Sequence, residues 1–182
     1  MNYHRVFIQN SYVHIIILSY DRSPIFIDNF ELLQQAFENA KYYFDFDVVA
    51  CCVLPDHIHF IMKPTNIEEY PRIITSIKYY FSRNYVGLES PTYNVNESSP
   101  LKIGYKNKRE KGIFQHRYYE HTIVDENELN KIIDYIHYNP VKHGYVDKVK
   151  NWAYSSFKRF VDKGYYDEDW CDFSAVKDLN YE

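Results

Sequence analysis

The sequence is poor in cysteine, has no long apolar run and shows no signal for export. Its 182 residues include three cysteines, Cys51, Cys52 and Cys171, and none has the paired spacing of a zinc site or a disulfide framework. The longest apolar stretch, around His14 to Leu18, is far too short to cross a membrane, and the N-terminus MNYHRVFIQN lacks a basic region followed by an apolar run. We therefore expect reduced thiols and a cytoplasmic protein with no part in a membrane.

The chain also lacks the excess of positive charge that is common in nucleic-acid enzymes, because its formal net charge is −4. The charge is unevenly distributed, however: residues 102–117 carry six bases against one acid, and residues 162–182 carry seven acids against two bases. The basic segment is a candidate phosphate-binding surface, although charged runs are often merely solvated. With 46% apolar residues the chain can bury a core, and we predict one domain over residues 1–161 followed by an acidic tail over 162–182.

Hydrophobic patterning predicts alternating strands and helices. Stretches rich in β-branched and aromatic residues predict strands at 13–20, 46–54, 57–63 and 114–124, and Pro55-Asp56 joins the middle two as a hairpin. Apolar residues at helical spacing predict helices at 29–44, 67–85 and 126–138. This order indicates an α+β fold, a ferredoxin-like antiparallel sheet with helices packed on one face.

Local signals mark the loop and the last helix. Residues 87–112 are polar and contain prolines, which predicts a long loop. Asp125 can cap the helix at 126–138, and Glu128 completes a capping-box arrangement. Asn139-Pro140 is expected to end this helix, because the residue before a proline avoids the helical conformation.

A His-x-His sequence lies in the second strand of the predicted hairpin. Because side chains alternate along a strand, His57 and His59 project from one face, while Ile58, Phe60 and Met62 project from the other. With the apolar side against the helices, the histidines face the open surface of the sheet, about 7 Å apart, where two neutral imidazoles can bind one metal ion. A lone His-x-His pair often occurs by chance, so the pattern needs a second element.

The helix predicted over 126–138 supplies this second element. An apolar stripe that must pack against the sheet is formed by Leu129, Ile132, Ile133 and Ile136. Tyr135 and Asn139 are four residues apart and lie on one face, at the shoulder of the stripe, where the hydroxyl can reach a substrate and the amide oxygen a metal ion. The residues alone leave open that Tyr135 only packs and that Asn139 only ends the helix.

Four motifs resemble those of one family of transposases. They are VLPDHIHFIMKP (53–64), IFQHRYYEHTI (113–123), DYIHYNPVKHGYV (134–146) and NWAYSSFKRFV (151–161). In this order they are similar to the successive motifs of the REP-associated tyrosine transposases, in the single-tyrosine branch of the HUH endonucleases. The similarity runs from about Tyr12 to Trp170, and the tyrosine-asparagine-proline motif followed by Val-Lys-His-Gly is specific.

The resemblance implies a ferredoxin-like domain with a catalytic tyrosine helix that uses Mg²⁺ or Mn²⁺ and acts on single-stranded DNA. In this family the DNA is often an imperfect hairpin from repetitive extragenic palindromes. Carried over by motif, His57 and His59 are the metal-binding pair, Asn139 is the third ligand and Tyr135 is the nucleophile. The implied product is a 5′-phosphotyrosine link with a free 3′-hydroxyl, and a second 3′-hydroxyl can reverse the step and join strands without ATP. The segment between Tyr85 and Gly112 is longer and more polar than the family pattern requires.

Several further residues are candidates for supporting roles. Candidates for contacts to phosphates or base edges are Arg117, Lys142, His143, Lys106, Lys108 and Arg109. Each is equally consistent with an ordinary surface residue. Glu120 and His121 are candidates for supporting the metal ligands, although His121 is as consistent with a hydrogen-bonded strand residue.

Two other functions remain open at this point. A DNA hairpin-binding protein of the same fold would need no cleavage, but the presence of His57, His59 and Tyr135 argues against it. A metal-dependent nuclease could use water as the nucleophile, with Tyr135 only packing. The sequence does not decide between a monomer and a homodimer.

Overall fold

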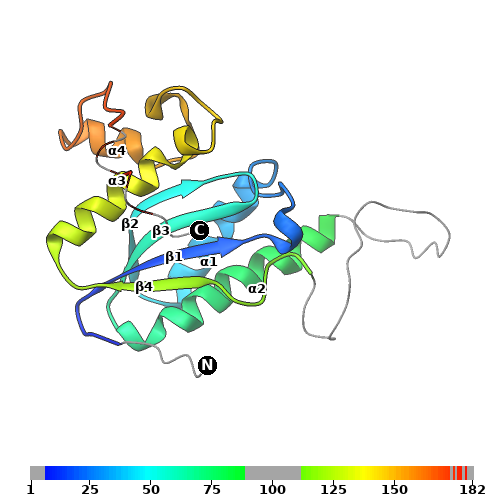
Figure 1. The fold of residues 1–182 in the computed structure, drawn as a ribbon. Helices are drawn as coiled ribbons and strands as arrows, with labels where there is room; N and C mark the ends of the chain where they lie inside the picture. The colour runs from blue at the N-terminus through cyan, green and yellow to red at the C-terminus, as the bar shows by residue number, and fades with distance from the viewer. Residues whose placement is uncertain (1–6, 89–111, 173, 175, 178, 180–182) are drawn as a thin grey trace.

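The computed structural model describes residues 7–88, 112–172, 174, 176, 177 and 179 (Figure 1). Most of the loop predicted over residues 87–112, with Lys106, Lys108 and Arg109, lies outside these residues. Within them, no helix combines the length and the apolar character that crossing a membrane requires.

Four antiparallel strands form a single sheet in the described part of the chain. They are β1 (Tyr12–Leu18), β2 (Phe46–Val53), β3 (His57–Pro64) and β4 (Tyr119–Ile123), in the spatial order β2-β3-β1-β4. The register of the two central strands pairs Ile16 with His59 and Leu18 with His57. Only the last strand is much shorter than predicted, because Phe114 makes an isolated bridge to Ser19 and regular pairing begins at Tyr119.

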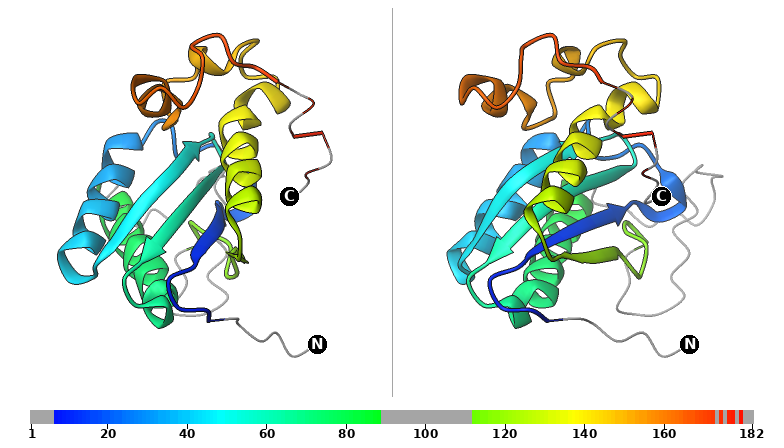
Figure 2. Two further views of the ribbon diagram at one scale, coloured as in Figure 1. Left: turned by 90° about the vertical axis from the view of Figure 1, so that its left-hand side faces the viewer. Right: turned by 60° about the vertical axis from the view of Figure 1, so that its left-hand side comes forward.

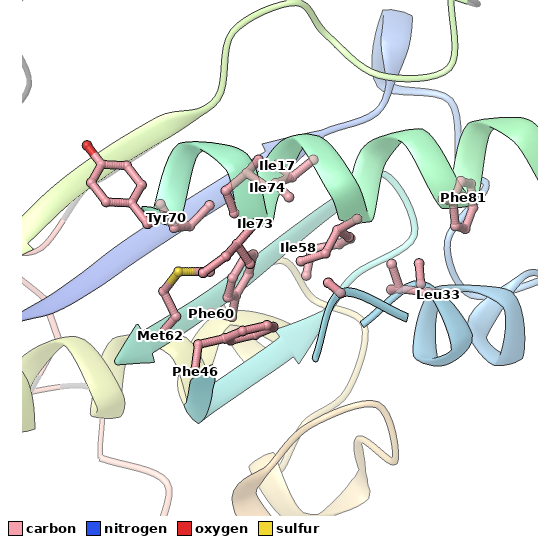
Figure 3. Packing of buried hydrophobic residues seen from close by; sticks show 14 of the residues in the cluster. Ile17, Leu33, Phe46, Ile58, Phe60, Met62, Tyr70, Ile73, Ile74 and Phe81 are labelled. Atoms are coloured by element: carbon pink, nitrogen blue, oxygen red, sulfur yellow. The ribbon is translucent and has the colours of Figure 1, made fainter. Parts of the chain in front are cut away.

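Helices α1 (Phe30–Tyr43) and α2 (Tyr70–Leu88) pack on one face of the sheet (Figure 2). A short 3₁₀ turn, η2 (Ile67–Glu69), precedes α2, and Pro71 lies in the first turn of α2, where no backbone N–H is required. The core on this face joins alternate residues of β1 and β3 to both helices (Figure 3). Its members from these two strands are Val13, Ile15, Ile17, Ile58, Phe60 and Met62, and β2 adds Phe46 and Val53. The alternation predicted for β3 is therefore confirmed.

Helix α3 (Glu126–Lys142) packs on the opposite face (Figure 2). The Asp125 carboxylate accepts a hydrogen bond of 2.8 Å from the Glu128 N–H, so the predicted cap is confirmed. The Glu128 carboxylate accepts from the Val124 N–H at 3.0 Å, one residue before the position that a standard capping box uses. The side chains of α3 that meet β2 and β3 include Ile132 and Ile136. The histidine face of β3 is therefore covered by α3, and the expectation that it is open is wrong.

The prediction that the last helix ends at Tyr138 is wrong, since α3 continues through Pro140 to Lys142. Proline at this point removes one hydrogen bond in the final turn, and the buried packing of Asn139 and Pro140 compensates for that loss. The helix ends where the His143 N–H donates to the Asn139 carbonyl at 3.0 Å and Gly144 takes a φ of 72°.

The C-terminal segment, which follows α3, packs against the end of the sheet and against α3. It contains η3 (Val149–Asn151) and α4 (Phe157–Asp162). The Trp152 indole N–H donates to the Val53 carbonyl at 3.0 Å, and the buried His137 Nε2 lies 2.8 Å from Ser156 Oγ. Tyr166 and Val176 pack with the α3 cluster. The boundary between residues 161 and 162 stays a prediction.

Candidate active site

The two histidines of β3 lie side by side under α3. Their ring centroids are 4.9 Å apart, and the side chains of His57 and His59 are 1% and 0% exposed. They share a face because strand residues two apart point the same way, and that face is the one on which α3 lies. The sequence-predicted pair is thus brought together at the boundary between the sheet and the tyrosine helix.

His57 is held by the carboxylate of Asp56, which the sequence analysis identified only as part of the hairpin turn. His57 Nδ1 lies 2.6 Å from Asp56 Oδ1, and Arg22 Nε donates to Asp56 Oδ2 at 2.5 Å. Burial raises the pKa of Asp56, but the hydrogen bond and charge of His57, and then the charge of Arg22, outweigh it and lower the pKa. Asp56 is therefore an anion that fixes the orientation of the His57 ring.

Arg22 reaches Asp56 from a strained turn, η1 (Tyr20–Arg22). Asp21 and Arg22 adopt φ values of 56° and 57°, in the left-handed region that residues other than glycine rarely occupy. Two hydrogen bonds to the Asp56 carbonyl, from the Ser19 N–H and the Ser19 hydroxyl, both at 2.9 Å, hold this turn against the hairpin. The turn costs on the order of 1 kcal/mol per left-handed residue, and the ion pair and the hydrogen bonds offset this cost.

Helix α3 places Tyr135 and Asn139 against the histidines. The Tyr135 ring centroid lies 5.7 Å from that of His59 at a steep angle, and the two α3 side chains are 1% and 0% exposed. Both are therefore buried rather than at a half-exposed shoulder. Asn139 Nδ2 donates to the Tyr135 carbonyl at 3.2 Å, whereas Asn139 Oδ1 accepts no hydrogen bond from any residue that the structure describes. A buried acceptor of this kind is normally satisfied, so Oδ1 fits a bound cation.

Lys142 and His143 belong to the same cluster. Lys142 Nζ donates a hydrogen bond of 3.0 Å to the Tyr135 hydroxyl and lies 4.9 Å from the centre of its ring. The His143 ring centroid is 5.2 Å from that of His57. Both residues lie at the tyrosine and the histidine pair because α3 extends past Pro140.

Sequence reasoning missed His14, which borders the histidine pair. It is fully buried, its ring stacks on His59 with centroids 5.8 Å apart, and Tyr119 lies at its edge. Burial, and then the charges of His59 and His121, lower the pKa of His14 well below its usual value, so His14 is neutral. Strand alternation places His14, Ile16 and Leu18 on one face of β1. The sequence does not show which of these residues lies next to His57 or His59, because that depends on the register of β1 with β3.

The other supporting candidates take different positions. His121 lies 2.7 Å from the Glu128 carboxylate and joins β4 to the start of α3. Glu120 pairs across the sheet with Ile15, a residue of the core under α1 and α2, so its side chain lies on the face opposite the histidines. Arg117 is exposed in the connection that precedes β4.

The candidate donor set is two imidazoles and one carboxamide. Within the described residues, no three His, Cys, Asp or Glu side chains are grouped to hold a metal ion. As ligands, two imidazoles and the oxygen of Asn139 would add no charge, which would leave the charge of a divalent ion available to a phosphate. Chemically, the site can present a phenol oxygen and an ammonium group next to a candidate cation site.

Comparison with known proteins identifies the family of this chain. The profile of the family described as "Transposase IS200 like" matches residues 7–139. A Haemophilus influenzae protein, named as a candidate REP-associated tyrosine transposase, is 39% identical over 93% of this chain and 92% of its own. An Escherichia coli REP-associated tyrosine transposase is 31% identical over 85% of this chain and 82% of its own.

The fold agrees with a solved member of the same group. The structure of a REP-associated tyrosine transposase bound to a REP hairpin superimposes with a TM-score of 0.77 and 27% identity, covering 99% of both chains. The matched region contains the four-stranded sheet, the histidine pair and the helix with Tyr135. The chain therefore belongs to the IS200-like transposase family and is a tyrosine transposase, similar to the REP-associated members.

Proposed function

We propose that this transposase cleaves and rejoins single-stranded DNA at hairpin sequences, with the aid of a divalent metal ion and through a covalent link to Tyr135. One observation carries the proposal: the ring centroids of Tyr135 and His59 lie 5.7 Å apart. The same cluster includes His57 and Asn139. These residues come from two elements far apart in the sequence, and packing of a helix against a strand requires none of them to be polar.

His57, His59 and Asn139 would hold Mg²⁺ or Mn²⁺. The Asp56 carboxylate at Nδ1 of His57 fixes the ring so that Nε2 is the ligating nitrogen. The buried Oδ1 of Asn139 would be the third donor. When bound, the ion polarises the scissile phosphate and stabilises the charge that develops on its oxygens.

Tyr135 would carry the covalent step. Its hydroxyl oxygen forms a bond to phosphorus as the bond from phosphorus to the 3′ oxygen breaks, its proton passes to solvent, and the 3′ oxygen takes up a proton. The products are a 5′-phosphotyrosine and a free 3′-hydroxyl. One ester bond replaces another, so a second 3′-hydroxyl can reverse the step without ATP. Burial in α3 holds the phenol in one orientation, which favours attack.

The substrate follows from the relatives. The solved relative is bound to a REP hairpin, and this chain matches it over almost its whole length, so we propose a hairpin of the same kind. The DNA would contact the basic residues outside the buried pair, which are Arg117, Lys142, His143, Lys106, Lys108 and Arg109. One chain supplies every proposed site residue, so one copy would suffice for the chemistry, whether the protein is a monomer or a homodimer. We propose that it acts in the cytoplasm.

The test is a search for the covalent adduct. Purified protein is incubated with Mn²⁺ and labelled single-stranded hairpin DNA from the flanks of its own gene, and the products are separated by denaturing electrophoresis. We expect an adduct that requires metal and is lost in Tyr135→Phe. Tyr138→Phe, which removes a hydroxyl from the same helix, is the matched control and should keep the adduct.

Other outcomes would replace the proposal. Cleavage that survives in Tyr135→Phe would make the protein a nuclease that uses water or another residue. Binding of the hairpin without cleavage by the unaltered protein would make it a hairpin-binding protein.

A further inference from the structure

We propose that Lys142 is a catalytic residue of the strand-transfer reaction: its ammonium group stabilises the negative charge that the Tyr135 oxygen carries as it attacks phosphorus and again as it leaves phosphorus. This inference rests on the proposed function, since it assigns a partner to the proposed nucleophile. It differs from the expectation that Lys142 serves only as a contact to DNA phosphates.

The geometry is that of a direct contact to the reacting atom. Lys142 Nζ is 3.0 Å from the Tyr135 oxygen, the ordinary distance of an N–H···O hydrogen bond. The two residues are seven apart, close to two turns of an α-helix, and so lie on the same side of α3. Lys142 reaches the phenol only because the helix continues through Pro140.

The burial of the phenol makes a cation necessary. Tyr135 is 1% exposed, so little water can solvate a negative charge on its ring, and an unsolvated buried anion is strongly disfavoured. Lys142 itself is exposed, so its ammonium group keeps its hydration while one N–H points to the phenol. The cation also lies 4.9 Å from the ring centre, which adds a favourable interaction with the aromatic ring.

The step balances with water as the proton carrier. The Tyr135 proton passes to solvent as its oxygen attacks, and that oxygen stays hydrogen-bonded to the exposed Lys142 ammonium group. The oxygen then bonds to phosphorus while the 3′ oxygen leaves and takes a proton from water. In the reverse step an incoming 3′-hydroxyl gives its proton to water, and the departing phenolate returns to the ammonium group. Lys142 neither gives nor takes a proton in this scheme.

The test separates this role from DNA binding. Lys142→Met removes the charge and keeps most of the length, Lys142→Arg restores a cation, and Lys131→Met removes an exposed lysine from the same helix as a control. The rate of adduct formation is measured at saturating hairpin DNA with Mn²⁺ at neutral pH, and the dissociation constant for DNA is measured separately.

We expect Lys142→Met to slow adduct formation by about 100-fold at neutral pH, the scale seen when one charge-stabilising donor is lost. Lys142→Arg should recover most of the rate, and Lys131→Met should match the unaltered protein. A normal rate at saturating DNA in Lys142→Met, with a weaker dissociation constant, would overturn the proposal and make Lys142 a phosphate contact. Adduct formation that persists in Tyr135→Phe would instead defeat the proposed function itself.

Discussion

The face of the sheet under α1 and α2 buries apolar side chains and the ring of Tyr70. The face under α3 buries apolar side chains as well, but it also buries three histidines, His14, His57 and His59. Neighbouring residues of one strand show the difference: Phe60 and His59 are both completely buried, and they point to opposite faces. The same strand therefore supplies the core on one side and the proposed metal ligands on the other.

The difference indicates a division of labour. Burial of carbon provides stability in proportion to the area removed from water, whereas burial of imidazole and carboxamide groups is unfavourable unless they find partners. A site built from such groups lowers stability in exchange for function. The apolar face must therefore supply most of the stability that keeps the histidine face in a fixed geometry.

The largest effect that tests this comparison is expected from Phe60→Ala. The Phe60 ring packs against Phe37 with centroids 5.2 Å apart, in the core beneath both helices. Its removal should lower the free energy of unfolding by about 3–5 kcal/mol, because a cavity replaces a buried ring. Urea denaturation followed by circular dichroism measures this change.

The neighbouring residue provides the matched variant. His59→Leu should change the free energy of unfolding by no more than about 1 kcal/mol in either direction, since an apolar side chain replaces a buried polar one. It should abolish the Tyr135 adduct. Equal losses of stability from the two variants would contradict the division between the faces.

A smaller effect is expected from acid, and it should appear on the α3 face. Burial, and then the charge of Arg159, lower the pKa of His137 from 6.5 to about 3. The unfolded chain thus binds a proton below pH 6.5 that the folded chain refuses until about pH 3. Stability must therefore fall as pH decreases through this window, by up to about 1.4 kcal/mol per pH unit. His14 contributes in the same direction.

Both tryptophans report on this side of the molecule, since Trp152 and Trp170 lie in the C-terminal segment that packs on α3. Urea unfolding followed by tryptophan fluorescence at pH 7, 6 and 5 should show the loss. His137→Gln should flatten the dependence, and His116→Gln, at an exposed position, should leave it unchanged. An identical slope in His137→Gln would show that other groups control the acid sensitivity.

The sequence was sufficient for features that depend on local periodicity. Alternation placed His57 and His59 on one face of β3, and the apolar stripe of α3 predicted which side of that helix meets the sheet. The end of α3 was not predictable by the same means, because the rule that a helix stops before proline weighs local sterics alone. In the folded protein the burial of Asn139 and Pro140 outweighs that preference.

The supporting residues were beyond local reasoning for a different reason. Arg22 meets Asp56 through a left-handed turn, and His14 meets His59 through the register of β1 with β3. Neither contact leaves a periodic trace in the chain, since each depends on how distant segments are aligned. Lys142 was identified as a candidate, but its partner depended on the extension of α3.

The smallest effects are expected from the two residues that hold His57 in place, Asp56 and Arg22. Asp56→Asn keeps the shape of the side chain but removes the charge at Nδ1 of His57, so it should weaken Mn²⁺ binding by about 10–100-fold while leaving the fold intact. Arg22→Met acts one step further away, and since the Arg22 side chain is 42% exposed, its loss should weaken Mn²⁺ binding less than Asp56→Asn does. Titration of the DNA-free protein with Mn²⁺, read by electron paramagnetic resonance, measures both variants without reference to cleavage. A larger loss of Mn²⁺ affinity in Arg22→Met than in Asp56→Asn would mean that the strained turn, rather than the carboxylate, positions His57. Unchanged Mn²⁺ affinity in both variants would mean that Asp56 does not support the metal site.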